Sequence, residues 1–464
     1  NMLNTAVGYA AGQLVTTGTE NTLIGGLTGD ALTEGGLNVA VGTSALGVDT
    51  KGSRNVAVGV SALNQQNFTS ATNSYNTGVG YQAGGAVTTG VENVLIGGLA
   101  GDALTDADYN VAIGTAALSA DTLGSRSIAI GQGTLGAQNF TSATDTYNIA
   151  LGYGAGSLVT TGKQNTLIGG LSGDAITTGE ANTALGYEAL GATTTANGNT
   201  GAGYRSLVAN TTGAANTGIG TNALVANTTG SSNTAVGYQA LDANTTASSN
   251  VAVGVSSLGT NTTGSANTAV GDSALFANTT AHNNTAVGSN ALVANTTGAG
   301  NTAIGSEALD ANTTAADNTA VGYQALTTNT TAANNTAIGV HALTSNTTGP
   351  NNTAVGRSAL LANTTGDTNT AVGKDSMVAN TTGTNNSAFG ARSLDANTTG
   401  ASNVAVGDMA LGANTTANSN TAVGTSAGAA NTTGANNTAV GNGAMTANTT
   451  GLQNVAVGDA ALDA

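Results

Sequence analysis

The chain has no cysteine and no tryptophan, and it has one proline, Pro350, among 464 residues. Without cysteine it can form neither disulfides nor thiolate metal sites, an absence that fits an extracellular bacterial or viral protein as well as a cytosolic one. Aromatic residues make up 3% of the chain, which is too few for a conventional large core. The composition therefore argues against an ordinary globular fold.

Charge is also scarce. Charged residues make up 7% of the chain, with 8 Lys and Arg against 24 Asp and Glu, for a net charge of −16. No basic patch exists, so a nucleic-acid or anionic-membrane partner is disfavoured. The acidity fits either cation binding or, as we prefer, the solubility of a long surface. The apolar runs are too short to span a bilayer, so we expect no membrane insertion.

What the chain does have is a strict 17-residue repeat. From Asn182 to Asn454 an asparagine opens each new repeat without a slip, and the consensus is N-T-A-V-G-x-x-A-L-x-A-N-T-T-G-x-x. We number the positions of each repeat from 1, the opening asparagine, to 17. Strict periodicity of this kind is typical of a solenoid, in which each repeat forms one coil stacked on the last.

The same repeat extends back to the start of the chain and gives 27 repeats in all. Two repeats, Asn55 to Asn76 and Ser127 to Asn148, are longer by four because N-F-T-S-A-T occurs at 67–72 and again at 139–144. The first part therefore has a 72-residue superperiod. We divide the chain into a decorated solenoid, 1–181, and a uniform solenoid, 182–464. Since the sequence begins and ends inside the pattern, we expect a segment of a larger polypeptide.

Each repeat combines short strands with glycine corners. Positions 2 to 4 alternate like a strand, and position 5 is always glycine, which suits a corner with positive φ or a close backbone approach. The A-N-T-T stretch predicts a second short strand, which leaves no room for a helix. The predicted fold is an all-β parallel β-solenoid (β-roll) of 17-residue coils, about 4.8 Å apart. The asparagines at positions 1 and 12 should stack as amide ladders along it.

Two rows of aliphatic residues are predicted to fill the coil interior. Position 4 is Val, Ile or Leu in almost every coil, and position 9 is Leu in nearly all regular coils, with Gly428 as a gap. The predicted solenoid core residues are Val236, Leu241, Val270, Leu275, Val321 and Leu326.

Position 3 is held to Ala or Gly in nearly every coil. If position 4 faces the interior, position 3 must face outward, because strand side chains alternate. An outward position should vary, so we expect another chain to pack closely there; a steric demand of the coil's own corner is the alternative. Leu23, Leu95 and Leu167 would then fill a local widening of that interface. The predicted inter-chain packing residues include Ala184, Ala235, Ala269 and Ala320.

Two motifs carry a resemblance. S-I-A-I-G at 127–131 and N-V-A-V-G at 55–59 resemble the S-V-A-I-G motif in head repeats of trimeric autotransporter adhesins. N-T-A-V-G-Y-Q-A-L at 233–241, repeated at 318–326, is similar to repeats in phage and prophage tail-fibre-like proteins. The resemblance covers essentially the whole chain, although the adhesin repeat is usually shorter than the repeat of this chain. It implies a left-handed parallel β-roll, three chains to a fibre and a role in attachment.

The residues suggest no enzyme. His282 and His341 are the only histidines, about three and a half coils apart at variable positions, and we interpret both as surface residues. Gly-Asp pairs recur at 29–30, 101–102 and 173–174, but a calcium β-roll would show a dense G-G-x-G-x-D pattern. We therefore predict no cofactor, with bound calcium as the open alternative.

The most plausible recognition elements are the two insertions, with Phe68, Tyr75, Phe140 and Tyr147. Exposed aromatics on a protruding loop commonly anchor partners or sugars, although each Phe could instead fold back to cap its bulge. The fifteen N-T-T triplets from Asn210 to Asn448 are formally N-glycosylation acceptors, but the repeat itself generates them. Regular hydroxyls could also bind ice, yet alternation leaves one outward threonine per triplet.

The sequence as a whole predicts a non-enzymatic extracellular fibre. We expect a homotrimeric shaft that holds an adhesive tip away from a cell or virion surface. Binding along the shaft, to a cell-surface or carbohydrate ligand, would be multivalent. Two alternatives remain: a self-assembling extracellular matrix or surface filament, and an ice- or glycan-binding solenoid that acts alone.

Overall fold

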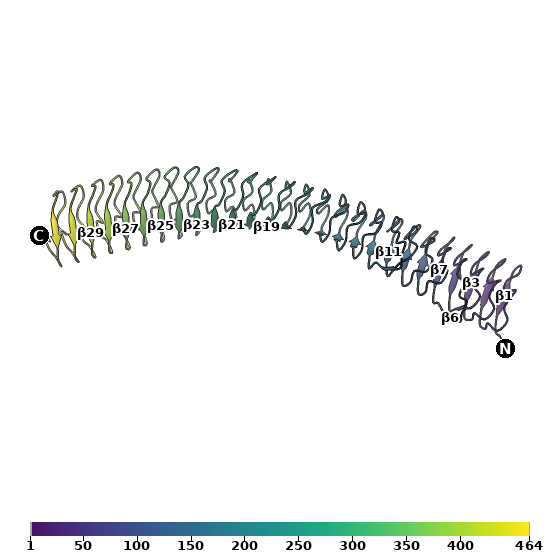
Figure 1. Ribbon diagram of the computed structural model, residues 1–464. Helices are drawn as coiled ribbons and strands as arrows, with labels where there is room; N and C mark the ends of the chain where they lie inside the picture. The colour runs from purple at the N-terminus through teal and green to yellow at the C-terminus, as the bar shows by residue number, and fades with distance from the viewer. Residues whose placement is uncertain (1, 464) are drawn as a thin grey trace. The chain divides into compact units, whose positions relative to one another are not determined.

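The computed structural model describes residues 2–463, and every regular element in that range is a β-strand. The predicted parallel β-solenoid is confirmed: each repeat forms one coil and places a three-residue strand, positions 2 to 4, in a parallel sheet along one wall of the stack (Figure 1). Since residues 2–463 contain no helix, this part of the chain has no helical segment that could cross a membrane.

The coils form two compact units, Asn1–Asn233 (unit 1) and Thr234–Ala464 (unit 2). Within unit 1, the sequence pattern changes at residue 181 without any change in strand length or register, since Thr166 pairs with Thr183 across that point. The division at 181 therefore marks a change in sequence pattern and not a change in the strands or their register.

Among the described residues, unit 1 contributes thirteen main strands. They are β1 (Thr5–Val7), β2 (Thr22–Ile24), β3 (Val39–Val41), β5 (Val56–Val58), β7 (Thr77–Val79), β8 (Val94–Ile96), β9 (Val111–Ile113), β11 (Ile128–Ile130), β13 (Ile149–Leu151), β14 (Thr166–Ile168), β15 (Thr183–Leu185), β16 (Thr200–Ala202) and β17 (Thr217–Ile219).

Unit 2 contributes fourteen main strands within the described range. They are β18 (Thr234–Val236), β19 (Val251–Val253), β20 (Thr268–Val270), β21 (Thr285–Val287), β22 (Thr302–Ile304), β23 (Thr319–Val321), β24 (Thr336–Ile338), β25 (Thr353–Val355), β26 (Thr370–Val372), β27 (Ser387–Phe389), β28 (Val404–Val406), β29 (Thr421–Val423), β30 (Thr438–Val440) and β31 (Val455–Val457).

Within each unit, every main strand pairs in parallel with the strand of the next coil. The register equals the repeat, so that Ala269 pairs with Ala286 and Val270 with Val287. The register runs unchanged past an insertion, where Val58 pairs with Val79. Equal positions of successive coils therefore lie directly above one another, which is what lets one side-chain type form a continuous row.

The predicted second strand at A-N-T-T is wrong. In these turns the N–H groups of Thr364, Thr365 and Gly366 converge on one acceptor, the Thr381 carbonyl, at 2.9, 3.3 and 3.4 Å. Convergence on one carbonyl curls the backbone, whereas an extended strand would alternate its bonds. Within residues 2–463, extra strands occur only beside the insertions: β4 (Gly52–Ser53) pairs with β6 (Thr72–Asn73), and β10 (Gly124–Ser125) pairs with β12 (Thr144–Asp145).

Position 5 requires glycine, as predicted. At Gly271 φ is +137°, and a Cβ atom would lie 2.6 Å from the carbonyl of Gly288 in the next coil. Three further positions, 7, 9 and 17, adopt positive φ and in most coils hold residues other than glycine; Gln324, Leu326 and Asn334 of one coil have φ of 51°, 55° and 60°. Each such residue costs about 1–2 kcal/mol, which the hydrogen bonds between coils must offset.

The predicted orientation of the strand is wrong. Position 3 faces the coil interior, where Ala184, Ala235, Ala269 and Ala320 are fully buried by their own chain. They are therefore not available to another chain. Position 4 faces outward instead, so Val236, Val270 and Val321 are only half-buried and do not belong to the core. Leu241, Leu275 and Leu326 at position 9 are fully buried, as predicted.

Both predicted asparagine ladders are confirmed. At position 1, the backbone N–H of Asn301 donates to Oδ1 of Asn284 at 2.9 Å. At position 12, Nδ2 of Asn312 donates to Oδ1 of Asn295 at 2.8 Å. The two ladders meet at position 15, since Nδ2 of both Asn284 and Asn295 donates to the Gly298 carbonyl at 2.9 Å. These buried amides are thus paired both along the stack and across the coil.

The leucines at position 3 fill space inside the coil, and not a contact with another chain. Leu95 lies where two coils have glycine in place of leucine at position 9: a Cβ added to Gly84 or Gly101 would be 2.5 or 2.7 Å from its side chain. In the coils of Gly84 and Gly101, position 12 is also aliphatic, Val87 and Leu104, and both are fully buried. Larger side chains at positions 3 and 12 therefore fill the space that glycine leaves at position 9.

Candidate functional surfaces

The outward face of the sheet is the most extensive unusual surface. Position 4 is apolar in every described main strand, although it is half-buried or exposed; Ile304, for example, is 41% exposed. Position 2, on the same face, is Thr, Val, Ile or Ser, and none of the main strands contains a charged residue. An uncharged apolar row of this length on a water-facing wall is typical of an interaction surface.

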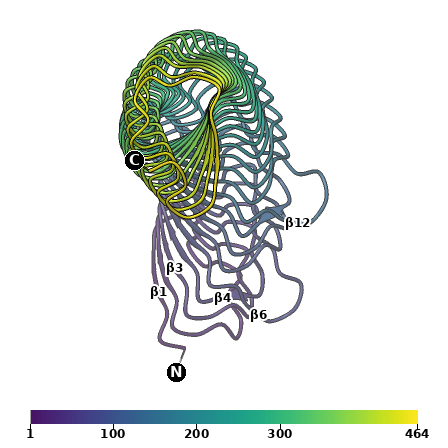
Figure 2. The same cartoon turned by 90° about the vertical axis from the view of Figure 1, so that its left-hand side faces the viewer.

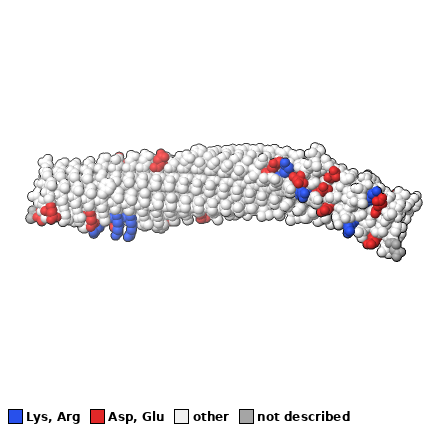
Figure 3. Space-filling model, turned by 60° about the horizontal axis from the view of Figure 1, so that its bottom comes forward, with Lys and Arg blue, Asp and Glu red and all other residues white. Residues whose placement is uncertain are grey.

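Other exposed positions of the coil vary in residue type, whereas position 4 is always apolar in the described main strands. Position 7 includes Glu188, Gln239, His341 and Arg392, all of which are at least partly exposed. Charged side chains lie in separate groups with uncharged surface between them on the face drawn in Figure 3. Because other exposed positions vary freely, exposure alone does not explain why position 4 stays apolar.

The two insertions are the other unusual feature. The loops beside β6 and β12 project beyond the other coils of unit 1 (Figure 2). Phe68 and Phe140 are 6% and 7% exposed, so each phenylalanine folds back and caps its bulge. They are therefore not exposed recognition residues, whereas Tyr75 and Tyr147 are 49% and 53% exposed.

A buried carboxylate anchors each insertion. Asp49 Oδ1 accepts the N–H groups of Gly52 at 3.0 Å and Phe68 at 3.2 Å, while Oδ2 accepts Nε2 of Gln66 at 2.6 Å. Burial raises the pKa of Asp49, and these hydrogen bonds act in the opposite direction. Gln66 in turn accepts from Nδ2 of Asn76 at 2.9 Å, which joins the anchor to the position 1 ladder.

The second insertion repeats this arrangement. Asp121 Oδ1 accepts the N–H groups of Gly124 at 3.1 Å and Phe140 at 3.0 Å, and Oδ2 accepts Nε2 of Gln138 at 2.6 Å. Position 12 therefore holds Asp and then Gln in the two coils around each insertion, where the uniform coils have Asn. This substitution is the sequence signal that we missed.

The residues considered for metal binding do not come together. His282 is exposed and its Nδ1 accepts the Ser265 N–H at 2.8 Å, while the ring of His341 lies edge-on to Tyr323 with centroids 5.5 Å apart. Asp102 and Asp174 lie at position 10, a superperiod apart, and burial raises the pKa of both. Among residues 2–463, no group of three or more His, Asp or Glu side chains could hold a metal ion.

The N-T-T triplets present one exposed threonine per coil. The asparagine of each triplet belongs to the buried position 12 ladder, with Asn448 at the end half-buried, so a glycosylating enzyme could not reach these amides in the folded coil. The first threonine donates its hydroxyl to the next coil, as Thr296 Oγ1 does to the Thr313 carbonyl at 3.0 Å. The second threonine, such as Thr297, is exposed.

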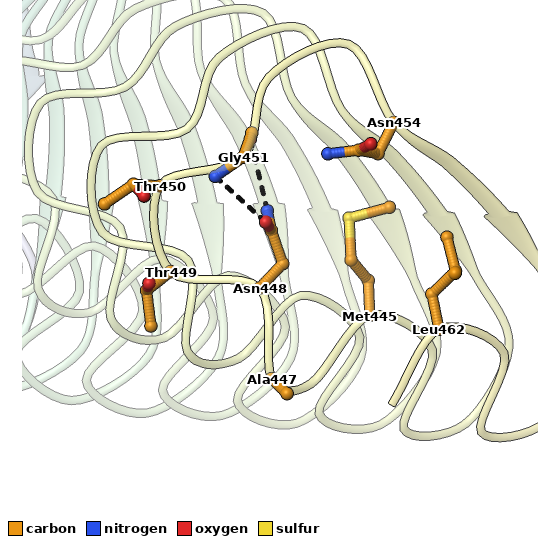
Figure 4. Close-up of a pocket in the computed structure, with 8 residues that line it drawn as sticks. All are labelled: Met445, Ala447, Asn448, Thr449, Thr450, Gly451, Asn454 and Leu462. Carbon is orange, nitrogen blue, oxygen red and sulfur yellow. Dashed lines mark hydrogen bonds between the residues drawn. The ribbon is translucent and has the colours of Figure 1, made fainter. Parts of the chain in front are cut away.

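Two hollows are present on the described surface. One, of about 330 Å³, lies at the last coils of unit 2, where Asn448 exchanges hydrogen bonds with Gly451 (Figure 4). The other, of about 300 Å³, is a polar groove in unit 1 between Gln65, Gln82 and Asp102, formed because Gly85 leaves position 10 empty.

Comparison with known proteins adds no name to this geometry. No family model matches the chain, and no curated protein matches it.

Proposed function

We propose that the chain is a non-enzymatic extracellular fibre shaft, in which sister chains pack side by side through the outward face of the sheet. It would hold an adhesive tip away from a cell or virion surface. The observation that carries the proposal is the uninterrupted apolar row at position 4, which the interior of a single chain does not need.

The face has the size that a stable contact between chains requires. In unit 2 alone, fourteen three-residue strands about 4.8 Å apart give a flat wall of about 650 Å². Standard stable interfaces bury about 600–1,000 Å² on each partner, so the wall of unit 2 alone lies within that range. The wall carries no charge, which suits a second copy of the same strongly acidic chain, because no acidic groups meet there. The number of chains, three, and the left-handed coil rest on the resemblance to adhesin and tail-fibre repeats.

The rigidity of a shaft follows from the same packing. Successive coils are joined by the parallel sheet, and most coils of unit 2 are joined also by two asparagine ladders and a leucine row, so bending would strain all of these contacts. Repetition sets the reach, and no coil depends on contacts outside its neighbours. A spacer needs rigidity and reach, and it needs no catalytic site.

The test measures molar mass by light scattering at increasing chain concentration. We expect a trimer for the wild type. A variant with Val270→Asp, Val287→Asp and Ile304→Asp should be a folded monomer, because three charges would be buried at the contact. The matched control places Asp at the exposed position 14 of the same coils, Thr280→Asp, Thr297→Asp and Thr314→Asp, and should stay trimeric. A monomeric wild type would refute the proposal, and end-to-end polymers would favour the matrix filament.

Ice binding is the second candidate, and a specific observation favours it. On the outward face, Thr at position 2 lies beside Val or Ile at position 4, as in Thr285–Val287 and Thr302–Ile304. The resulting rows of hydroxyl and methyl groups repeat at the spacing of the coils. A monomer that inhibits ice recrystallisation, and loses that activity with Thr285→Lys and Thr302→Lys but not with Thr297→Lys and Thr314→Lys, would support this function over the fibre.

A further inference from the structure

The two insertions are built alike beyond their identical N-F-T-S-A-T sequence. Each carries a buried phenylalanine, a buried aspartate that accepts the N–H group of that phenylalanine, and a small parallel sheet of its own. Threonine and serine at the tips, Thr69 and Ser70 in the first copy, are exposed. A loop fixed in this way presents the same surface twice.

An arginine and a tyrosine lie next to each loop. In the first copy, Nε of Arg54 donates to Oδ1 of Asn73 at 3.1 Å, and the guanidinium carbon lies 5.7 Å from the centre of the Tyr75 ring. Because the bond uses Nε, the two terminal nitrogens of the guanidinium remain available to a ligand. The tyrosine presents half of its surface to solvent.

The second copy has an arginine and an exposed tyrosine, Arg126 and Tyr147, at the equivalent positions, and its guanidinium lies over an additional ring, that of Tyr109. Nε of Arg126 lies 3.0 Å from Oδ1 of Asp145, and its guanidinium carbon lies 4.7 Å from the centre of the Tyr109 ring. The hydroxyl of Tyr147 donates to Oδ2 of Asp145 at 3.3 Å. An exposed aromatic face, a fixed guanidinium, an amide or carboxylate acceptor and loop hydroxyls thus occur together at both insertions.

We propose that each insertion, with its exposed tyrosine (Tyr75 or Tyr147) and its arginine (Arg54 or Arg126), is a subsite for one sugar of a neutral polysaccharide. A pyranose ring has an apolar C–H face, which the exposed tyrosine can stack against, and an edge of hydroxyls that both donate and accept hydrogen bonds. Arg54 and Arg126 supply donors, while Asn73 and Asp145 supply acceptors. An anionic polymer is disfavoured, because the chain carries a net charge of −16 and Asp108 and Asp145 lie near Arg126.

The spacing of the subsites makes the site bivalent. Four coils separate the two copies within unit 1, which places them about 19 Å apart along the stack. One polysaccharide chain can reach both, and the second contact then forms at a high effective concentration. Weak single subsites therefore give firm attachment. This inference rests on the proposed adhesive fibre and names its ligand class and site.

The test uses biolayer interferometry with the full chain against immobilised mannan, dextran and galactan, and against alginate and heparin as anionic polymers. We expect at least one neutral polymer to bind. Tyr75→Ala or Tyr147→Ala should each weaken that binding about tenfold, and the double variant should lose it, as loss of both contacts removes the avidity. The matched control is the pair Tyr81→Ala and Tyr153→Ala, also one superperiod apart, 57% and 64% exposed, which should change affinity less than twofold.

Three outcomes would overturn the inference: no binding to a neutral polymer, binding to anionic polymers alone, or wild-type affinity in the double variant. Light scattering on the same samples keeps this result separate from the proposed function. A trimer that binds no polysaccharide would refute the subsites and leave the fibre intact, whereas a monomer that binds one would refute the fibre.

Discussion

Unit 2 and the decorated coils of unit 1 fill the same interior with different residues. In unit 2 the core is repetitive, with Ala at position 3, Leu at 9 and Asn at 12 in most coils. In unit 1, Leu95 at position 3 faces Gly84 and Gly101 at position 9, and Leu104 takes the place of a ladder asparagine. The strands keep their length and register regardless. The coil therefore fixes the volume of its interior and the pairing of its buried polar groups, while either wall of the coil can supply the side chains that fill it.

The largest expected effect is a loss of stability when a leucine that fills the interior at position 3 is removed. Leu95→Ala should lower the free energy of unfolding by about 4 kcal/mol, and Leu326→Ala in unit 2 by about 3 kcal/mol. The difference is expected because Leu95 covers two glycines at once. Chemical denaturation measures both variants. Adding Gly84→Leu to Leu95→Ala should recover about 1 kcal/mol or more; a double loss equal to the sum of the single losses would contradict the exchange between walls.

The next effect concerns the asparagine ladder at position 12, which the coils of unit 2 have and the decorated coils lack. Asn295→Ala should lower the free energy of unfolding by about 2 kcal/mol, because one N–H of the buried Nδ2 of Asn312 loses its acceptor, while the other still donates to the Ala315 carbonyl. The control is Thr193→Ala, at position 12 of the first coil of the uniform solenoid, where a 3.4 Å contact from Nδ2 of Asn210 is lost. This substitution should lower the free energy of unfolding by less than about 1 kcal/mol. Equal costs would mean that the amide ladder adds little to stability.

A smaller effect, with opposite sign, is expected at the one coil of unit 2 that has no large side chain at position 9. Gly428 has no compensating leucine at position 3, and only Leu411 Cδ2, at 3.1 Å, would crowd a Cβ there. Burying a leucine contributes about 1.5–3 kcal/mol, while its left-handed backbone costs about 1–2 kcal/mol. Gly428→Leu should therefore stabilise unit 2 by about 1 kcal/mol. Thermal unfolding checks it, and a lower midpoint would contradict it.

The smallest effect is on the pH dependence of stability and concerns the carboxylate that anchors the first insertion. Burial raises the pKa of Asp49 in the folded chain, so the folded state holds the proton more tightly than the unfolded state. The unfolding free energy should then fall as pH rises from about 3.9 through the folded pKa. Asp49→Asn should flatten this part of the profile in thermal unfolding between pH 4 and pH 8. An unchanged slope would exclude Asp49 as its source.

Much of this architecture could be predicted from the repeat alone. Period, parallel register, both asparagine ladders, the position 5 glycine and the position 9 leucine all followed from spacing and from the few side chains each position allows. The facing of the strand could have been predicted as well. Position 3 shares a face with position 1, whose asparagine had to be inside for its ladder, and leucine at position 3 occurs only where position 9 is glycine.

Other features had no such signal. Positive φ at positions 7, 9 and 17 falls on Gln, Leu, Ser and Arg alike, because hydrogen bonds between coils impose it rather than residue preference. The only sequence signal for the polar anchor of the first insertion was Asp49 and Gln66 at position 12, where the uniform coils have asparagine. Whether Phe68 pointed in or out depended on the space beneath the loop, which local sequence does not specify.

Reactivity of single introduced cysteines tests the central claim most directly, since the native chain has none. Ala269→Cys, Val270→Cys and Thr280→Cys would be treated with a maleimide at concentrations where light scattering shows self-association. We expect Ala269→Cys to react only after denaturation, because its side chain is inside the coil. Val270→Cys should be protected in the assembly and react in the dilute monomer, and Thr280→Cys should always react. A Val270→Cys that reacts as fast as Thr280→Cys in the assembled protein would contradict the central claim.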